Sequence, residues 1–198
     1  MQVRTLHRLC GAFALALGAD AASAHTGVGL AGGFASGFMH PLLGWDHVVA
    51  MIAVGLWGAF LGAPAIWVLP VTFPLVMTIG GALGVMGVPL PGVEIGIALS
   101  AIVLGAMVAF AARPPLWVAA ILVAAFAVFH GHAHGVELPS AADPIAYSLG
   151  FVVATGLLHL AGIAIGLVVR WRHGKRLVQA CGVAISIAGV VFLLKPPA

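Results

Sequence analysis

The residues best suited to chemistry lie in the stretch Phe129–Glu137, which reads F-H-G-H-A-H-G-V-E. It carries three histidines and a carboxylate, although Asp, Glu, Lys and Arg make up only 7% of the chain. On a helix that turns about 100° per residue, His130, His134 and Glu137 fall on one stripe, whereas His132 points to the opposite side. A polar stripe inside an apolar helix is costly unless it is paired, hydrated or bound to a cation. The stretch therefore predicts one wall of a cation site.

A second polar group, from His40 to His47, reads H-P-L-L-G-W-D-H. Pro41 and Gly44 favour a break in a helix, and a break at membrane depth is stable only where the freed backbone groups face protein or a cavity. Asp46 could bind a cation directly or orient a histidine by accepting its ring N–H. Alternatively, the segment is an interfacial turn in which Asp46 caps the second half-helix.

Three residues outside these motifs are further candidates. Glu94 opens a predicted helix and is either an interfacial residue or a ligand. His159 is the only histidine or charged residue between positions 144 and 169, so it either bonds a neighbouring helix or acts as a relay. If a signal peptide ends at Ala24, His25 offers an α-amine beside its imidazole. His130, His159 and His25 are accordingly secondary or relay positions.

The donor types indicate which ions would bind. Imidazole and carboxylate without thiolate suit borderline divalent ions such as nickel, cobalt or zinc, and they do not separate these ions from one another. Cys10 and Cys181 are the only cysteines, and neither belongs to a C-x-x-C pair. We therefore predict a divalent-cation substrate and no tightly bound cofactor.

Composition places the chain in a bilayer. The 198 residues are 63% hydrophobic, with a mean hydropathy of +1.19, which is typical of an integral membrane protein. The net charge is +3 and most basic residues lie near segment ends, so nucleic acid is not implied as a partner.

The N-terminus has the pattern of a secretory signal peptide. Basic residues at Arg4 and Arg8 precede an apolar core from Leu9 to Ala19, and Ala22-Ser23-Ala24 forms an A-x-A cleavage site. The alternative is an uncleaved first helix, in which Asp20 would be awkward. We predict a signal peptide over residues 1–24 and one transmembrane helical domain over residues 25–198.

Apolar segments separated by Pro, Gly or charge follow the signal. Most have the roughly 17–25 residues that a helix needs to cross a bilayer. They cover 27–43, 45–62, 65–87, 93–112, 116–134, 144–170 and 176–194.

Charge sets the predicted topology. The strongest basic cluster, Arg170–Arg176, should be cytoplasmic. With the mature N-terminus outside, residues 25–62 must then cross an odd number of times. We therefore predict one crossing there, broken at Pro41–Gly44, and an all-α, polytopic protein of six transmembrane helices with both mature termini periplasmic. Asp46, His47, Glu94, His134 and Glu137 would all lie near outer helix ends, with His159 deeper.

These motifs resemble the HupE/UreJ family of hydrogenase and urease accessory proteins, which are nickel permeases. The resemblance rests on A-H-T-G after the signal, on H-P-x-x-G-x-D-H, on F-H-G-x-A-H-G-x-E and on T-G-L-L-H-L-A-G at 155–162. It implies nickel import across the inner membrane, with cobalt as an alternative, and delivery to hydrogenase or urease nickel-insertion machinery. The functional positions that it implies are His40, Asp46, His47, Glu94, His134 and Glu137.

Two other functions compete with transport. A membrane metalloenzyme, such as a diiron hydroxylase or a metal hydrolase, would need more histidine boxes than the single His130/His134 pair, and no Ser or Cys nucleophile is expected beside a base. A bis-histidine haem protein would leave the carboxylates without a role. The chain has no Walker motif, so it does not itself couple transport to ATP.

Overall fold

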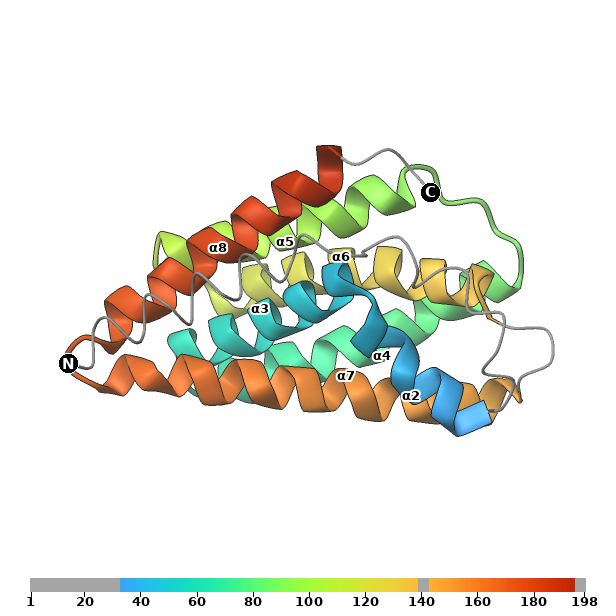
Figure 1. Ribbon diagram of the computed structural model, residues 1–198, viewed down its shortest axis with the longest axis horizontal. Helices are drawn as coiled ribbons and strands as arrows, with labels where there is room; N and C mark the ends of the chain where they lie inside the picture. The colour runs from blue at the N-terminus through green and yellow to red at the C-terminus, as the bar shows by residue number, and fades with distance from the viewer. Residues whose placement is uncertain (1–32, 139–142, 195–198) are drawn as a thin grey trace.

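The computed structural model describes residues 33–138 and 143–194, and within them every regular element is helical (Figure 1). This confirms the all-α prediction. The elements are α2 (Gly33–Leu43), α3 (Trp45–Leu61), α4 (Ala65–Val85), α5 (Val93–Ala109), α6 (Leu116–Val136), α7 (Pro144–Gly166), the 3-10 turn η1 (Leu167–Arg170) and α8 (Gly174–Leu194).

Residue types explain where the helices begin and end. Asp143 caps α7, because its Oδ1 accepts hydrogen bonds from the backbone N–H groups of Ile145 and Ala146 at 2.9 and 2.8 Å. Pro144 follows in the first turn, where its missing N–H costs nothing. Gly62, at the end of α3, has a φ of 84°, a conformation that few other residues adopt.

The helix break predicted at Pro41–Gly44 is confirmed. α2 and α3 meet at Gly44 with a bend of 82°, and Pro41 lies within α2. Figure 1 shows α2 running along α7 into the bundle, where α3 takes over in a new direction. The break therefore lies among the other helices.

In the part of the chain that the structure describes, four helices are long and apolar enough to cross a membrane: α4, α6, α7 with η1, and α8. The bent pair α2 and α3 makes a fifth candidate if it is one span. α5 is apolar but has 17 residues, which falls short of the length of the others. The predicted signal peptide and His25 lie outside the described residues.

From α3 to α8 the helices alternate in direction, and they pack in close pairs, α4 on α6, α5 on α8 and α3 on α7 (Figure 1). α3 is the central helix, with 13 of its 17 residues buried. The core around it holds large side chains such as Trp57, Leu56 and Phe73, all 0% exposed.

Glycines set the contact between α4 and α6. A Cβ on Gly131 would collide with the Met77 carbonyl, and one on Gly135 with the Gly81 carbonyl. The glycines of H-G-H-A-H-G thus let the two backbones touch, as small residues do in membrane helix pairs. They fix the rotation of α6, and with it the direction of the histidines between them.

Replacing Gly131 with valine should therefore lower stability by about 1–3 kcal/mol, because the added carbons must push α4 away. The matched control is Gly156→Val on α7, because a Cβ there meets no atom of the described residues within 4 Å. Melting temperatures of the two purified variants, followed by size-exclusion chromatography after heating, would test this. Equal losses would contradict the packing role.

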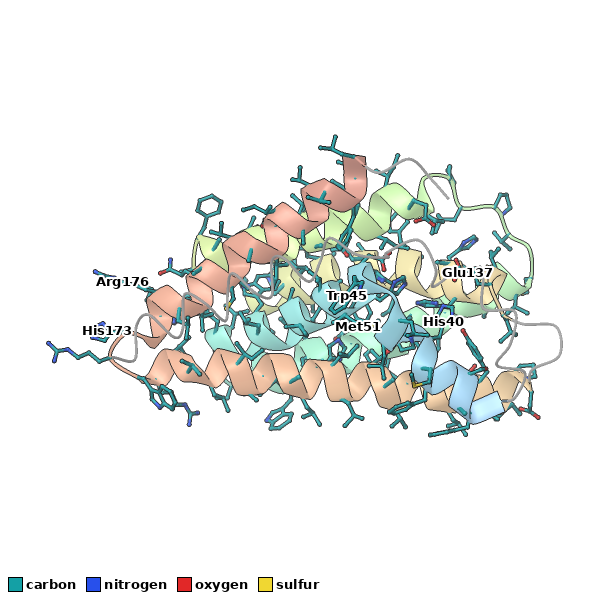
Figure 2. The ribbon with its side chains drawn as sticks, in the orientation of Figure 1. His40, Trp45, Met51, Glu137, His173 and Arg176 are labelled. Carbon is teal, nitrogen blue, oxygen red and sulfur yellow. The ribbon has the colours of Figure 1, made fainter. Side chains whose placement is uncertain are left out.

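Charge divides between the two ends of the bundle among the described residues. Figure 2 shows His173 and Arg176 at one end, beyond η1, and Glu137 toward the other. Arg113 belongs to the basic end, since its guanidinium lies 5.0 Å from the ring of Phe60 near the end of α3. Glu94 and Asp143, at the starts of α5 and α7, belong to the opposite end.

Candidate metal site

Three of the predicted ligands meet at the end of the bundle opposite the basic residues. One ligand atom from each of His40, His134 and Glu137 lies within 4.8 Å of the other two. His40 Nε2 is 3.3 Å from Glu137 Oε2, and His134 Nδ1 is 4.0 Å from the same oxygen. We call these three residues the outer cluster. It joins the two sequence motifs, one on α2 and one on α6.

The broken helix places His40. Gly37 and Gly150 allow α2 to touch the backbone of α7, because a Cβ on either would collide with a carbonyl of the other helix. The bend at Gly44 then turns the chain into α3. As a result His40 lies beside the last turns of α6, its ring centroid 4.8 Å from that of His134.

Asp46 and His47 form a second polar pair in the first turn of α3. Asp46 Oδ1 lies 2.7 Å from His47 Nδ1 and accepts a bond from the His47 backbone N–H at 2.9 Å. A carboxylate only accepts, so the His47 ring carries its proton on Nδ1 and a lone pair on Nε2. His47 is 2% exposed, and its Nε2 has no hydrogen-bond partner within residues 33–138 and 143–194. This Asp46 oxygen is thus engaged in orienting a histidine.

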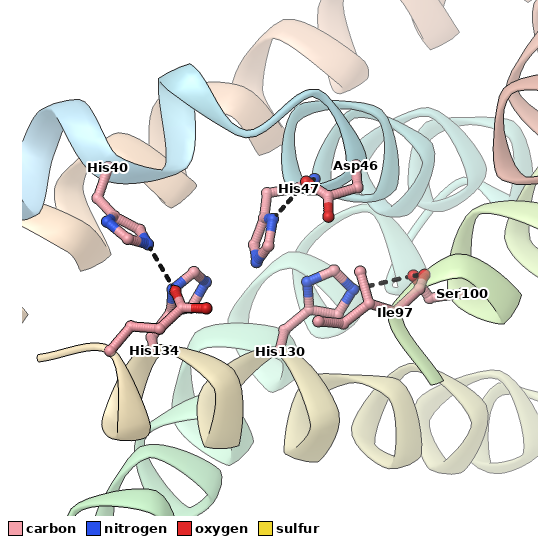
Figure 3. A network of polar contacts seen from close by, with 8 residues as sticks. His40, Asp46, His47, Ile97, Ser100, His130 and His134 are labelled. Atoms are coloured by element: carbon pink, nitrogen blue, oxygen red, sulfur yellow. Dashed lines mark hydrogen bonds and ion pairs between the residues drawn. The ribbon is translucent and has the colours of Figure 1, made fainter. Parts of the chain in front are cut away.

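The histidine rings form a continuous row that leads inward from the outer cluster (Figure 3). Ring centroids are 4.4 Å apart for His134 and His47, and 4.9 Å apart for His47 and His130. His130 is fully buried, and its Nε2 lies 2.9 Å from Ser100 Oγ on α5. His130 stands six residues before the end of α6, about 9 Å along the helix.

Phe73 on α4 packs against the inner end of this row, between His130 and His159. Its ring centroid is 5.4 Å from that of His130 and 5.4 Å from that of His159. His159 lies near the backbone carbonyl of Pro70, but neither of its ring nitrogens makes a hydrogen bond within the described residues. That carbonyl lacks its usual helical donor because Pro74 has no N–H. Among the described residues, His159 is thus a buried imidazole beside α4 without the hydrogen bond to a neighbouring helix that was considered from sequence.

The other predicted positions lie apart from the row. Glu94 is exposed in the first turn of α5. His132 points away from the row, as its position on the helix predicts, and its Nε2 lies 2.7 Å from the Val88 carbonyl. It therefore ties α6 to the connection between α4 and α5.

Sequence reasoning missed Ser100 and Tyr147. Ser100 is 0% exposed in an apolar helix, and an isolated hydroxyl in such a segment is a signal that could have been followed. Tyr147 is 3% exposed, and its ring centroid is 6.0 Å from that of His40. The expectation that no serine lies beside a base is wrong for Ser100, which contacts His130.

A cavity of about 350 Å³ adjoins the outer cluster between α4, α6 and α7. His134 and Tyr147 form part of its wall, and Met77, Gly81 and Phe151 supply apolar surface. It is large enough for several water molecules. A hydrated ion could therefore reach His134 from this side.

Fold and site together define a class: a multi-pass helical membrane protein with a histidine–carboxylate cluster beside a broken helix. The chain belongs to the HupE/UreJ protein family, whose model matches residues 13–192. It is 44% identical over 172 residues to Protein HupE of Rhizobium leguminosarum bv. viciae, a match that covers 86% of this chain and 90% of that protein. No solved structure matches the chain.

Proposed function

We propose that this protein is a permease that imports divalent nickel across the inner membrane to supply hydrogenase or urease maturation. The observation that carries the proposal is the outer cluster of His40, His134 and Glu137, held at a helix break at the end of the bundle away from the basic residues. Nitrogen and oxygen donors without thiolate suit Ni²⁺, and they suit Co²⁺ as the alternative substrate.

Orientation follows from the charge division. The end with Arg113 and the 170–176 cluster is cytoplasmic by the positive-inside rule, so the outer cluster faces the periplasm. In this arrangement α5 also crosses the membrane, which brings the number of spans to six. The signal peptide is removed, and both mature termini are periplasmic. Glu94, exposed at the periplasmic end, adds negative charge that attracts cations to the mouth of the site.

The membrane potential is a sufficient driving force. Moving one charge through 100 mV is worth about 2.3 kcal/mol, so an inward divalent ion gains about 4.6 kcal/mol. Import can then proceed without ATP, in keeping with the missing Walker motif.

The contact between Ser100 and His130 raises one enzyme alternative, a hydrolase that uses Ser100 as its nucleophile. Ser100 Oγ lies 2.6 Å from the Ile97 carbonyl, which can only accept, so the hydroxyl proton is directed there and away from His130. His130 must then donate to Ser100, which is the reverse of general-base activation. The serine is also fully buried, which keeps it from a substrate. Its hydrogen bonds and its burial therefore both argue against a hydrolase.

Uptake of radioactive nickel by cells with and without the protein tests the proposal. We expect saturable uptake that depends on the protein and on the membrane potential, and that cobalt inhibits more strongly than magnesium. Competition at submicromolar nickel by unlabelled nickel, cobalt and zinc would rank the substrates. Equal uptake in the two cell lines would refute a role in import.

A further inference from the structure

Beneath the outer cluster lies a buried pair of imidazoles, His47 and His130, whose ring centroids are 4.9 Å apart at an interplanar angle of 88°. They are 2% and 0% exposed. Neither belongs to the outer cluster. His47 also lies next to His134, so the pair continues inward from that cluster.

Hydrogen bonds fix the tautomer of His130. Ser100 Oγ lies 2.6 Å from the Ile97 carbonyl and 2.9 Å from His130 Nε2. The carbonyl can only accept, so the serine proton goes to Ile97 and the serine oxygen accepts from His130. The ring proton of neutral His130 therefore sits on Nε2, and Nδ1 carries a lone pair.

His47 is fixed in the complementary way, because Asp46 Oδ1 accepts from its Nδ1 and leaves the lone pair on Nε2. His47 Nε2 and His130 Nδ1 are both buried, and neither has a hydrogen-bond partner among the described residues. Figure 3 shows the two rings side by side, with the marked contact of His47 to Asp46 and that of His130 to Ser100. Two acceptors cannot bond each other, and leaving both unpartnered is costly.

A group that satisfies two lone pairs at once must be a cation or a donor of two protons. Histidines that bind metals usually donate their other ring N–H to a fixed acceptor, and here Asp46 and Ser100 are those acceptors. A water molecule could donate to both rings instead, and the experiment below separates the two cases.

We infer that His47 Nε2 and His130 Nδ1 form a second, inner station for the transported divalent cation, which Ser100 positions through His130. The inference rests on the proposed function and deepens it. One ion moves from the outer cluster to this inner station, with His134 and His47 in contact at the transfer. Two divalent ions so close together would repel strongly, so the stations are occupied in turn.

Replacing His130 with glutamine tests the station. The glutamine amide can still donate to Ser100, but it has no group at the position of Nδ1. We expect nickel uptake to fall at least tenfold in maximal rate, while nickel affinity of the purified variant, set by the outer cluster, stays within about twofold of wild type. That retained affinity also reports that the variant is folded. Wild-type uptake would overturn the inner station.

Binding can be measured at the inner station alone. In the double variant His40→Gln with Glu137→Gln, we expect weak residual Co²⁺ binding, detected by visible absorption, and its loss when His130→Gln is added. Residual binding that ignores His130, or no residual binding at all, would overturn the proposal and favour a bridging water.

Ser100→Ala tests the positioning role. Without the serine acceptor, the His130 proton is free to move to Nδ1 and block the lone pair, so we expect a several-fold lower maximal rate with an unchanged KM. The control is Ser186→Ala. The Ser186 hydroxyl donates to the Ile102 carbonyl at a distance of 2.9 Å and is not part of the site. Equal rates for the two variants would discard the role of Ser100.

These outcomes separate from those of the proposed function. If the wild-type protein does not import nickel, the permease assignment fails whatever the variants do. If it imports nickel and His130→Gln imports it equally well, only the inner station fails.

Discussion

Nickel uptake is expected to fall below about one tenth of the wild-type rate when His134 is replaced with alanine. His134 is the buried member of the outer cluster, and its ring lies 4.8 Å from that of His40 and 4.4 Å from that of His47. Its removal takes away a ligand and also interrupts the row of imidazoles. A tenfold loss corresponds to about 1.4 kcal/mol, which is modest for one metal ligand. Initial rates of radioactive nickel uptake at equal protein levels measure it.

The control for this variant is His173→Ala. His173 lies at the basic end of the bundle, so its imidazole is remote from the proposed periplasmic ligands (Figure 2). Its uptake should match that of wild type. If His134→Ala keeps more than half of the wild-type uptake, the outer cluster does not lie on the ion path.

The helices were largely predictable, and the reason is physical. Segments bounded by Pro, Gly and charge have one stable conformation in a bilayer, so the predicted 65–87 became α4 at Ala65–Val85 and the predicted 116–134 became α6 at Leu116–Val136. The break at Gly44 followed from residue type as well. α5 came out shorter than the predicted 93–112, because the chain turns through a positive φ at Ala111.

The residues of the site were largely predictable from the sequence, but the contacts between them were less so. The spacing of His130, His134 and Glu137 indicated one face of a helix, and His134 and Glu137 do share a cluster. That His40 joins them, whereas Glu94 stays exposed, depends on the 82° bend and on backbone contacts between α2 and α7. Such distances between segments remote in sequence are set by packing and have no periodic signal. The roles of Ser100 and Phe73 are of this kind.

Replacing Asp46 with asparagine should lower the maximal rate of nickel uptake by about 10–100-fold, the range found when the partner of a ligating histidine is lost. The asparagine side chain is nearly the same size, but its amide N–H₂ can face His47 Nδ1. His47 would then carry its proton on Nε2, and the lone pair would no longer point at the ion. The negative charge beside the buried imidazole would be lost as well.

Asp143→Asn provides a matched control, because Asp143, like Asp46, stands at the N-terminal end of a helix. Asparagine caps a helix about as well as aspartate does. We expect wild-type uptake from this variant. Comparing nickel affinity with maximal rate then locates the effect of Asp46→Asn. A direct ligand at the outer cluster would chiefly weaken binding, whereas a residue that orients His47 would leave capture by His40, His134 and Glu137 largely intact and slow the inward step. Unchanged rate and affinity would mean that the Asp46–His47 bond has no part in transport.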